Sequence, residues 1–334
     1  MKGDTKVTFK RLEKANEIPF GREVRVTTMN HIIEIVSLAR EPSNCLKYRK
    51  INKTSYMDIT TGEVFEYKLN ENRGQNIKGL KSTFKTIRNL INNNFTGASN
   101  ELFITLSYKE NMTDVKKLYL DFKKFIQKLK RKHNDIEYLS IVEPQGRGAW
   151  HCHVLMKFNQ LETVYIKNND EIWPMWGHGF TKTKSLKDID NIGAYLNAYL
   201  TDVEITDENE KILWDAVRHR DSAWITVNED NGETYNVKVH DDVELKVVER
   251  EVSEDGKKVT KKFLKGARLH MYPSGMNLYR CSRGIKKPDT EKMMYLEAKK
   301  KVGSRPANFS QTTEISKDGR TVNTITYEHY NLKR

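Results

Sequence analysis

The chain has 334 residues, of which 37% are hydrophobic and 31% are charged. This balance is typical of a globular protein with a very polar surface. No apolar run approaches the length of a membrane-spanning helix, so we expect no membrane partner. The net charge of +13 favours a polyanionic partner such as nucleic acid, and the alternative is a basic solvated surface with no such role.

Three cysteines, Cys45, Cys152 and Cys281, are widely spaced and form no CxxC pair. They predict no disulfide framework and suit a reducing compartment. The N-terminal residues lack the apolar core of a signal peptide. We therefore expect a cytoplasmic protein.

The first 75 residues are expected to be polar and irregular, apart from one hairpin that turns at Thr60-Thr61-Gly62. A helix is predicted over residues 77–93, where apolar residues recur at three- and four-residue spacing. The same helix carries a basic stripe of Lys78, Lys81, Lys85 and Arg88. The stripe is either a solvated helix face or a face that follows DNA phosphates. We assign residues 1–100 to an accessory region with an expected DNA contact.

Residues 101–108 predict a mostly buried strand, because they are rich in Phe, Ile, Leu and Thr. A Lys-rich amphipathic helix should follow, capped by Asn111 or Thr113. Two further strands are predicted over residues 137–143 and 150–157, joined by a turn rich in Gly and Pro.

His151 and His153 point to the same side of the strand at 150–157, since side chains alternate between its faces. Two imidazoles on a rigid strand can share one divalent metal ion. The alternative is a pair of surface histidines flanking a buried Cys152. By position, Glu143 or Gln145 on the preceding strand can supply a further ligand. We favour Glu143, because a carboxylate suits a hard cation, and we hold Gln145 as an alternate or outer ligand.

Residues 177–184, GHGFTKTK, predict another strand, in which His178 is expected to be structural or substrate-facing. Residues 189–201 predict a short helix with Tyr195 and Tyr199 on one face, although aromatic pairs at this spacing are usually part of a core. Residues 203–264 form a charged, hairpin-rich insertion with a helix near its start. Residues 265–334 regain apolar content and close with a hairpin that turns at Asp318-Gly319.

Three motifs occur in one order: FITLS at 103–107, EPQGRGAWHCH at 143–153, and a helix with two tyrosines. This set resembles the rolling-circle replication initiators of the HUH endonuclease superfamily. Their pattern is an apolar motif with threonine, a His-hydrophobic-His metal motif and a helix with a nucleophilic tyrosine. Cys152 fills the middle position as a small hydrophobe. The resemblance covers about residues 101–202 and resumes at 272–288, which is similar to Rep proteins of Gram-positive plasmids and integrative elements.

The resemblance implies an α+β fold: a central antiparallel sheet with helices packed on it, in a ferredoxin- or RRM-like nuclease core over residues 101–202. Residues 203–264 would be an insertion, and residues 265–334 the C-terminal part of the core with a β tail.

It also implies a nickase that starts rolling-circle replication. A tyrosine would attack a metal-polarised phosphodiester, keep the 5′-phosphate as an ester, free a 3′-hydroxyl primer and later rejoin the strand. Tyr199 is the favoured first nucleophile, and Tyr195 is a helper or second nucleophile. The metal would be Mn²⁺ or Mg²⁺.

The expected partners are origin DNA, single-stranded or hairpin at the nick, and a host helicase and DNA polymerase. No GxxxxGK[ST] phosphate loop is present, so no nucleotide cofactor is expected. Related initiators often carry lysine three residues after the tyrosine, whereas this chain has Ala198 and Asp202 there; Lys187 or another basic residue would have to substitute. The expected DNA contacts outside the first hundred residues are Arg147, Arg280, Arg283, Lys286 and Lys287.

Two alternatives remain. A conjugative relaxase or a transposase would use the same chemistry. A non-catalytic basic nucleic-acid-binding protein would use the histidines only structurally.

Overall fold

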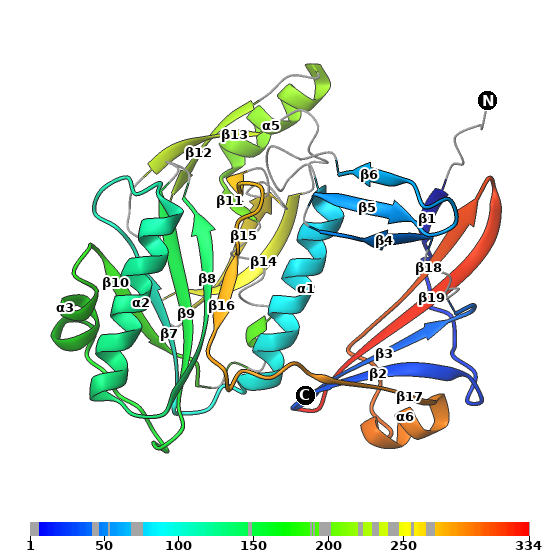
Figure 1. Ribbon diagram of the computed structural model, residues 1–334, viewed down its shortest axis with the longest axis horizontal. Coiled ribbons are helices and arrows are strands. Elements are labelled where there is room, and N and C mark those ends of the chain that lie inside the picture. Colours follow the sequence, from blue (N-terminus) through cyan, green and yellow to red (C-terminus); the bar gives the residue numbers. More distant parts are fainter. Residues whose placement is uncertain are drawn as a thin grey trace. The chain divides into compact units, whose positions relative to one another are not determined.

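The computed structural model describes residues 7–41, 47–52, 54–67, 76–145, 149–187, 189, 191–193, 202–219, 223–228, 234–239, 247–254, 257–264 and 271–333. Helices and antiparallel sheets occur along these ranges, so the chain has the predicted α+β fold (Figure 1). Contacts divide it into two compact units, one of residues 1–69, 92–94 and 287–334 and the other of residues 70–91 and 95–286. Both ends of the chain thus contribute to the first unit.

The larger sheet of the first unit is built from strands near both ends of the chain. Its order is β1 (Val7–Arg11), β18 (Phe309–Lys317), β19 (Arg320–Asn331), β3 (Ile32–Leu38), β2 (Glu23–Met29) and β17 (Asp289–Met294). Helix α6 (Tyr295–Val302) packs through Tyr295, Ala298 and Val302 on apolar side chains of β2 and β3. The hairpin predicted at Asp318-Gly319 is confirmed, because it joins β18 to β19.

The expectation that residues 1–75 are irregular apart from one hairpin is wrong for β1, β2 and β3. Buried Val24 and Val26 alternate with exposed residues in β2, as in a strand with one covered face. Asn30, with φ 52°, then allows a tight turn into β3. The partners of β1 and β3 come from the C-terminal hairpin, about 300 residues away, and local sequence does not reveal them.

A smaller sheet in the first unit comprises β4 (Tyr48–Lys50), β5 (Ser55–Asp58) and β6 (Val64–Glu66). Its β5–β6 hairpin confirms the turn predicted at residues 60–62. Asp58 holds this turn by accepting a 2.8 Å hydrogen bond from the amide of Thr60. Gly62, with φ 75°, supplies the left-handed conformation that the turn requires.

The second unit is organised around a central antiparallel sheet, as predicted. The strand order is β10 (Thr181–Ser185), β7 (Glu101–Leu106), β9 (Trp150–Phe158), β8 (Ile136–Pro144) and β16 (Tyr279–Cys281). The predicted strands at 101–108, 137–143 and 150–157 are therefore confirmed within one or two residues of their ends.

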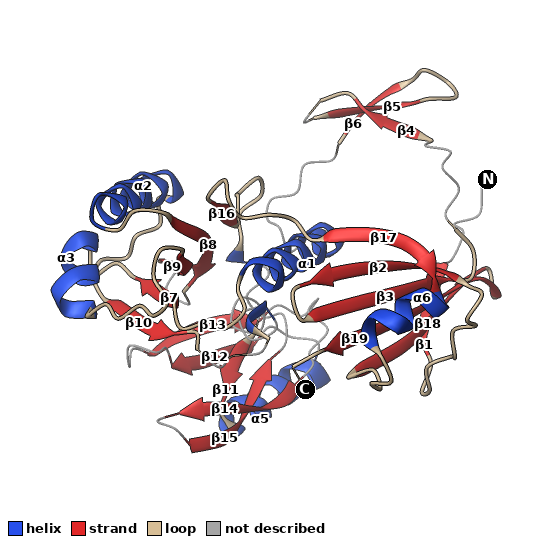
Figure 2. Cartoon of the chain, turned by 90° about the horizontal axis from the view of Figure 1, so that it is seen from below, coloured by secondary structure: helices blue, strands red, loops and turns tan. Residues whose placement is uncertain are grey.

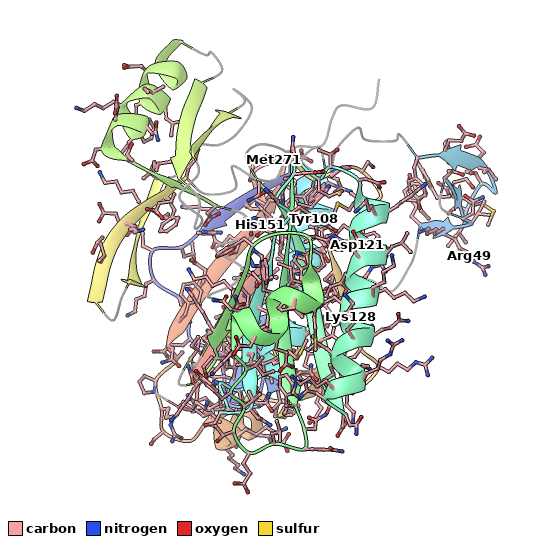
Figure 3. All side chains as sticks on the ribbon, turned by 90° about the vertical axis from the view of Figure 1, so that its left-hand side faces the viewer. Arg49, Tyr108, Asp121, Lys128, His151 and Met271 are labelled. Carbon is pink, nitrogen blue, oxygen red and sulfur yellow. The ribbon has the colours of Figure 1, made fainter. Side chains whose placement is uncertain are left out.

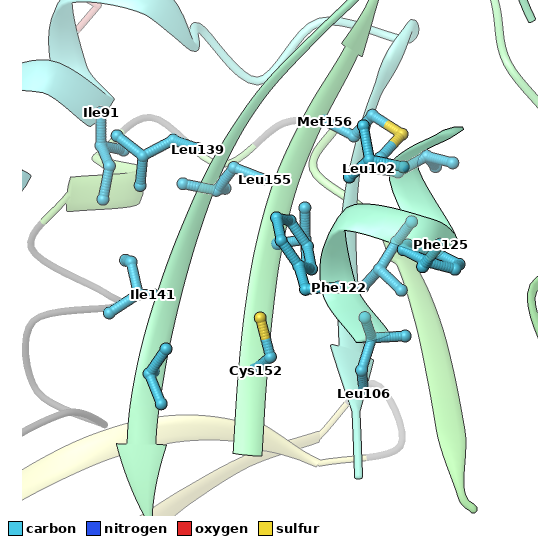
Figure 4. Close-up of a cluster of buried hydrophobic side chains, with 14 of the residues drawn as sticks. Ile91, Leu102, Leu106, Phe122, Phe125, Leu139, Ile141, Cys152, Leu155 and Met156 are labelled. Atoms are coloured by element: carbon cyan, nitrogen blue, oxygen red, sulfur yellow. The ribbon is translucent and has the colours of Figure 1, made fainter. Parts of the chain in front are cut away.

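Helices α1 (Ile77–Asn94) and α2 (Val115–Lys132) contribute to the core of this unit, and both confirm predicted helices. In Figure 4, Cys152 and Met156 lie on the side of Phe122 in α2, whereas Leu139 and Leu155 lie on the side of Ile91 in α1. The cap of α2 is Asp114, which accepts hydrogen bonds from two backbone amides, rather than the predicted Asn111 or Thr113.

The remaining elements of the second unit lie between β9 and β16 in the sequence. The π-helical turn η2 (Asn168–Ile172) leads into α3 (Trp173–Trp176), and the predicted charged helix is α5 (Asp207–His219). The predicted insertion contains two hairpins, β12 (Ala223–Asn228) with β13 (Thr234–Val239) and β14 (Val247–Glu254) with β15 (Lys257–Leu264). Strand β11 (Val203–Ile205) pairs with β15.

Of the predicted helix at 189–201, only Ile192 and Gly193 are described as helical, and residues 194–201 lie outside the described residues. Among the helices that the structure describes, none combines the length and the apolar character needed to span a membrane.

Candidate active site on the central sheet

The register of β8 and β9 places the predicted metal ligands on one face of the central sheet. Glu143 lies opposite His151, and Ile141 lies opposite His153, so these side chains share a face. Trp150 and Cys152 point to the other face. Trp150 fixes the start of β9 there, because its indole Nε1 donates to the carbonyl of Thr113 at 3.0 Å.

His153 is held from three directions. Its Nε2 lies 2.5 Å from Oε2 of Glu143, and its Nδ1 lies 3.2 Å from Oγ1 of Thr105. The ring of Phe103 stacks on the imidazole, with centroids 5.3 Å apart and planes 11° apart. The ring centroid of His151 is 6.0 Å from that of His153, and the two rings are almost perpendicular. Strand-borne histidines and a carboxylate are therefore brought together as predicted.

The site is shielded from solvent. Glu143 is 5% exposed and His151 is 8% exposed, and Gln145, just after β8, is fully buried. In such surroundings charges interact more strongly than in water, so a cation near Glu143 would be attracted more strongly than at the protein surface. The amide of Gln145 donates to the carbonyl of Ala149 at 2.7 Å, which fixes the chain between the two strands.

The donor set has the chemistry of a mixed nitrogen and oxygen metal site, although it is not preformed. Across the residues that the structure describes, no group of three or more His, Cys, Asp or Glu side chains is arranged to hold an ion. Glu143 and His153 instead contact each other directly. A divalent ion would take the place of this hydrogen bond, with His151 beside it as the second imidazole. Two imidazoles and one carboxylate suit Mn²⁺ or Mg²⁺ with open coordination positions.

Two residues at the site belong to the FITLS motif, but their contacts were not predicted. Thr105 and Phe103 alternate to the same face of β7, which pairs with β9 so that Thr105 lies opposite His153. The alternation was visible in the sequence. Which strand lies beside β9 was not, because strand order is a tertiary property.

Lys182 is a further residue that sequence reasoning missed. It lies on β10 opposite Thr105, so it shares the face of the histidines, two strands from His153. With strands about 4.8 Å apart, a lysine side chain can reach toward a ligand held at His153. The predicted strand at 177–184 was the available signal. The proposed substitute, Lys187, is exposed beyond the end of β10.

Several predicted residues cannot be placed beside the histidines. Tyr195, Tyr199 and Arg147 lie outside the described residues, and the side chain of Lys78 is also not described. Lys81 and Lys85 are exposed on α1, and Arg88 is half-buried there.

Basic residues after β16 are separated from the histidines by the sheet or by the chain. Arg280 lies opposite Ser140 and so points to the α2 face, where its guanidinium stacks 3.6 Å above the ring of Tyr119. Arg283, Lys286 and Lys287 are exposed in the segment that follows. A DNA contact at these positions stays a prediction.

His178 belongs to a separate polar network at α2. Tyr108 and Lys117 donate to Oδ2 of Asp121 at 3.0 and 2.9 Å, and His178 Nε2 lies 3.7 Å from the same oxygen (Figure 3). Burial would raise the pKa of Asp121, but these hydrogen bonds outweigh it and hold that pKa below its usual value. Burial lowers the pKa of His178. These contacts support the structural role expected for His178.

Residues 101–204 match the model of a family of replication-associated proteins, described by its member ORF2. The matched range runs from β7 through β10 to β11, and so includes every residue of the site around His153. It covers less than a third of the chain. No curated protein and no solved structure matches the chain. The match supports an association with DNA replication for this part of the protein.

Proposed function

We propose that this protein is a replication initiator that nicks one strand of origin DNA and later rejoins it. One observation carries the proposal: the range that matches a replication-associated family coincides with the sheet on which Glu143 meets His153 and His151. The net charge of +13 is in accord with a DNA partner. The finer assignment, to HUH-type initiators of rolling-circle replication, rests on the order of the three motifs.

The residues on the sheet would bind the ion and keep it in place. His151, His153 and Glu143 are the proposed ligands, with Gln145 as the alternate. When bound, Mn²⁺ or Mg²⁺ would supply Lewis-acid polarisation of a phosphate oxygen. Thr105 and Phe103 restrain the ring of His153, so the imidazole need not be ordered when the substrate arrives.

A tyrosine on the segment after β10 would be the nucleophile, with Tyr199 favoured and Tyr195 as helper or second nucleophile. Its phenolic oxygen would bond to phosphorus and give up its proton, while the bond from phosphorus to the 3′ oxygen breaks. That oxygen would take up a proton and become the free 3′-hydroxyl. The ester to tyrosine conserves the energy of the phosphodiester, so the reverse reaction rejoins the strand without a nucleotide cofactor.

The partners proposed for this activity are origin DNA, single-stranded or in a hairpin at the nick, and a host helicase and DNA polymerase. The helicase would expose the strand that is cut, and the polymerase would extend the 3′-hydroxyl.

The test is the formation of a covalent adduct. The protein is incubated with single-stranded origin oligonucleotides and Mn²⁺, and the adduct is detected by a gel shift under denaturing conditions and mapped by mass spectrometry. We expect an adduct on Tyr199 or Tyr195 that is lost in the Tyr195→Phe, Tyr199→Phe double variant. His151→Ala should abolish it as well. Tyr165→Phe is the matched control, because Tyr165 is an exposed tyrosine of the same unit.

Two results would contradict the proposal. An adduct that persists in the double variant would remove both tyrosines from the mechanism. If the wild type forms no adduct with any strand of the origin but still binds it, the protein is a non-catalytic DNA-binding protein.

A further inference from the structure

The small sheet of β4, β5 and β6 gathers aromatic side chains on one of its two faces (Figure 2). Lys50 and Phe65 lie opposite Tyr56 in the register, and Tyr48 lies two residues before Lys50. The ring of Tyr67, just beyond β6, also contacts Tyr56. We call Tyr48, Tyr56, Phe65 and Tyr67 the aromatic face. Arg49, Met57 and Val64 point to the opposite face.

The rings hold one another in place. Tyr56 is at the centre: its ring centroid is 5.4 Å from Phe65, 5.4 Å from Tyr48 and 4.8 Å from Tyr67. The Phe65 ring is stacked on that of Tyr56, and the Tyr48 ring meets it edge-on. Such contacts fix ring orientation, so little conformational entropy remains to be lost when a ligand binds.

The outer rings remain accessible. Tyr48 is 48% exposed, and Phe65 and Tyr67 are each 39% exposed. Several large aromatic side chains gathered on one exposed face indicate an interaction site rather than a core. The arrangement is that of a platform, with one ring half-buried and three presented to solvent.

The charge on this face favours a polyanion. Lys50 is a direct cross-strand neighbour of Tyr56, and the ammonium of Lys47 lies 5.1 Å from the ring centroid of Tyr48. Asp58 shares the face, but it is buried and accepts the hydrogen bond that holds the β5–β6 turn. Glu66 points to the opposite face, because it is paired with Ser55.

We propose that the aromatic face binds single-stranded DNA, whose unpaired bases stack on Tyr48, Phe65 and Tyr67 while Lys47 and Lys50 contact phosphates. Exposed rings combined with cations are the features by which proteins bind single strands without reading their sequence. A duplex is a poorer ligand, since its bases are already stacked on each other. This site lies in the first unit and is separate from the proposed nicking reaction in the second, so it goes beyond that function and does not depend on it.

The first test measures binding of a labelled oligothymidylate to the full-length protein by fluorescence anisotropy, with EDTA present so that no strand is cut. We expect the Tyr48→Ala, Phe65→Ala double variant to bind about 30-fold more weakly or worse, given the contribution of each stacked base. Tyr48→Phe keeps the ring and should bind like the wild type. Val64→Ala removes an exposed apolar side chain from the opposite face and should also leave binding unchanged.

A charge-matched pair tests the phosphate contact. Lys50 and Arg49 are exposed neighbours on β4 that point to opposite faces. Lys50→Ala should weaken binding and make it less dependent on salt, whereas Arg49→Ala should change both less. Equal effects of the two substitutions would overturn the phosphate assignment.

The second test needs no substitution. An oligothymidylate carrying 5-iodouracil is photo-crosslinked to the wild-type protein, and the crosslinked peptides are identified by mass spectrometry. We expect crosslinks within residues 47–67. Crosslinks confined to other residues, a double variant that binds as tightly as the wild type, or an equal loss of affinity for duplex DNA would each overturn the proposal. The covalent-adduct experiment can succeed or fail whichever of these results is obtained.

Discussion

Thr105 determines which nitrogen of His153 can bind a metal ion. A hydroxyl can accept a hydrogen bond from Nδ1–H, which leaves the lone pair of Nε2 directed at Glu143 and available to an ion. The same hydroxyl can donate to Nδ1 when Nε2 carries the proton and donates to Glu143. Thr105 therefore supports both the hydrogen-bonded arrangement and the proposed metal-bound one.

Thr105→Val should weaken metal binding. Valine keeps the shape of the side chain but cannot hold the Nδ1–H tautomer, and loss of such a partner lowers metal affinity about 10- to 100-fold. Mn²⁺ titration followed by electron paramagnetic resonance measures the effect. Thr183→Val is the control: its hydroxyl also makes a hydrogen bond, to Asn168, but it points to the other face. Unchanged affinity in Thr105→Val would contradict the assignment.

The buried thiol between the two histidines gives a second prediction at this scale. Burial raises the pKa of Cys152 to about 12, so the thiol stays protonated at neutral pH and is unreactive. Iodoacetamide at about pH 8 should modify the exposed Cys281 first and reach Cys152 only after urea unfolding. Peptide mapping by mass spectrometry distinguishes the two sites.

The pH dependence follows from the direction of the shift. The folded pKa of Cys152 lies above that of an unfolded thiol, so the stability gained by burying the neutral group is complete below the unfolded pKa. It is lost as the pH rises through the folded value. Rapid labelling of Cys152 in the native protein would show that β9 opens more readily than its burial implies.

At the scale of elements, β10 extends the site because it pairs with β7 and not because it is near β9 in sequence. The pairing places Lys182 beside Thr105 and Lys184 beside Phe103, both on the face of the histidines. Lys182 is thus the cation that the strand brings toward the site, at a position where the tyrosine-bearing helix lacks the usual lysine.

Lys182→Ala should slow adduct formation about 10- to 100-fold, which corresponds to the loss of one hydrogen bond to a charged group. Lys182→Arg should retain part of the rate. Lys184→Ala is the matched control, because Lys184 has the same charge and the same face but lies about 7 Å further along the strand. Single-turnover adduct formation is the measurement, and equal rates for the two alanine variants would refute a specific role for Lys182.

At the scale of the whole molecule, the first unit depends on both ends of the chain. Strands β18 and β19 lie between β1 and β3, and β19 supplies the ladder partner of β3. Glu328 on β19 accepts hydrogen bonds from Tyr295 of α6 and from Tyr330. Removing this hairpin would leave β3 without one ladder and α6 without a buried partner.

A chain that ends after Gly303 should therefore lose the sheet of the first unit while the central sheet of the second keeps its protection. Hydrogen exchange with mass spectrometry is the measurement: amides of β2 and β3 should exchange fast, and those of β8 and β9 slowly. A chain ending at Leu332 keeps the hairpin and serves as the control. Intact protection of β3 in the shorter chain would contradict the dependence.

The sequence by itself determined the second unit's main elements and the ligands of its site. Helical spacing located α1 and α2, and strand alternation put His151 and His153 on one face, since both patterns are set by local backbone geometry. The charge of the chain pointed to nucleic acid for a similarly local reason, since it is a sum over residues.

Only the tertiary structure decided which strands are neighbours. It paired β7 and β10 beside β9, which brought Thr105, Phe103 and Lys182 to the site, and it turned Arg280 to the opposite face. It also joined β1 and β3 to a hairpin at the far end of the chain. Strand order and register depend on burying side chains that are distant in sequence, so no local pattern encodes them.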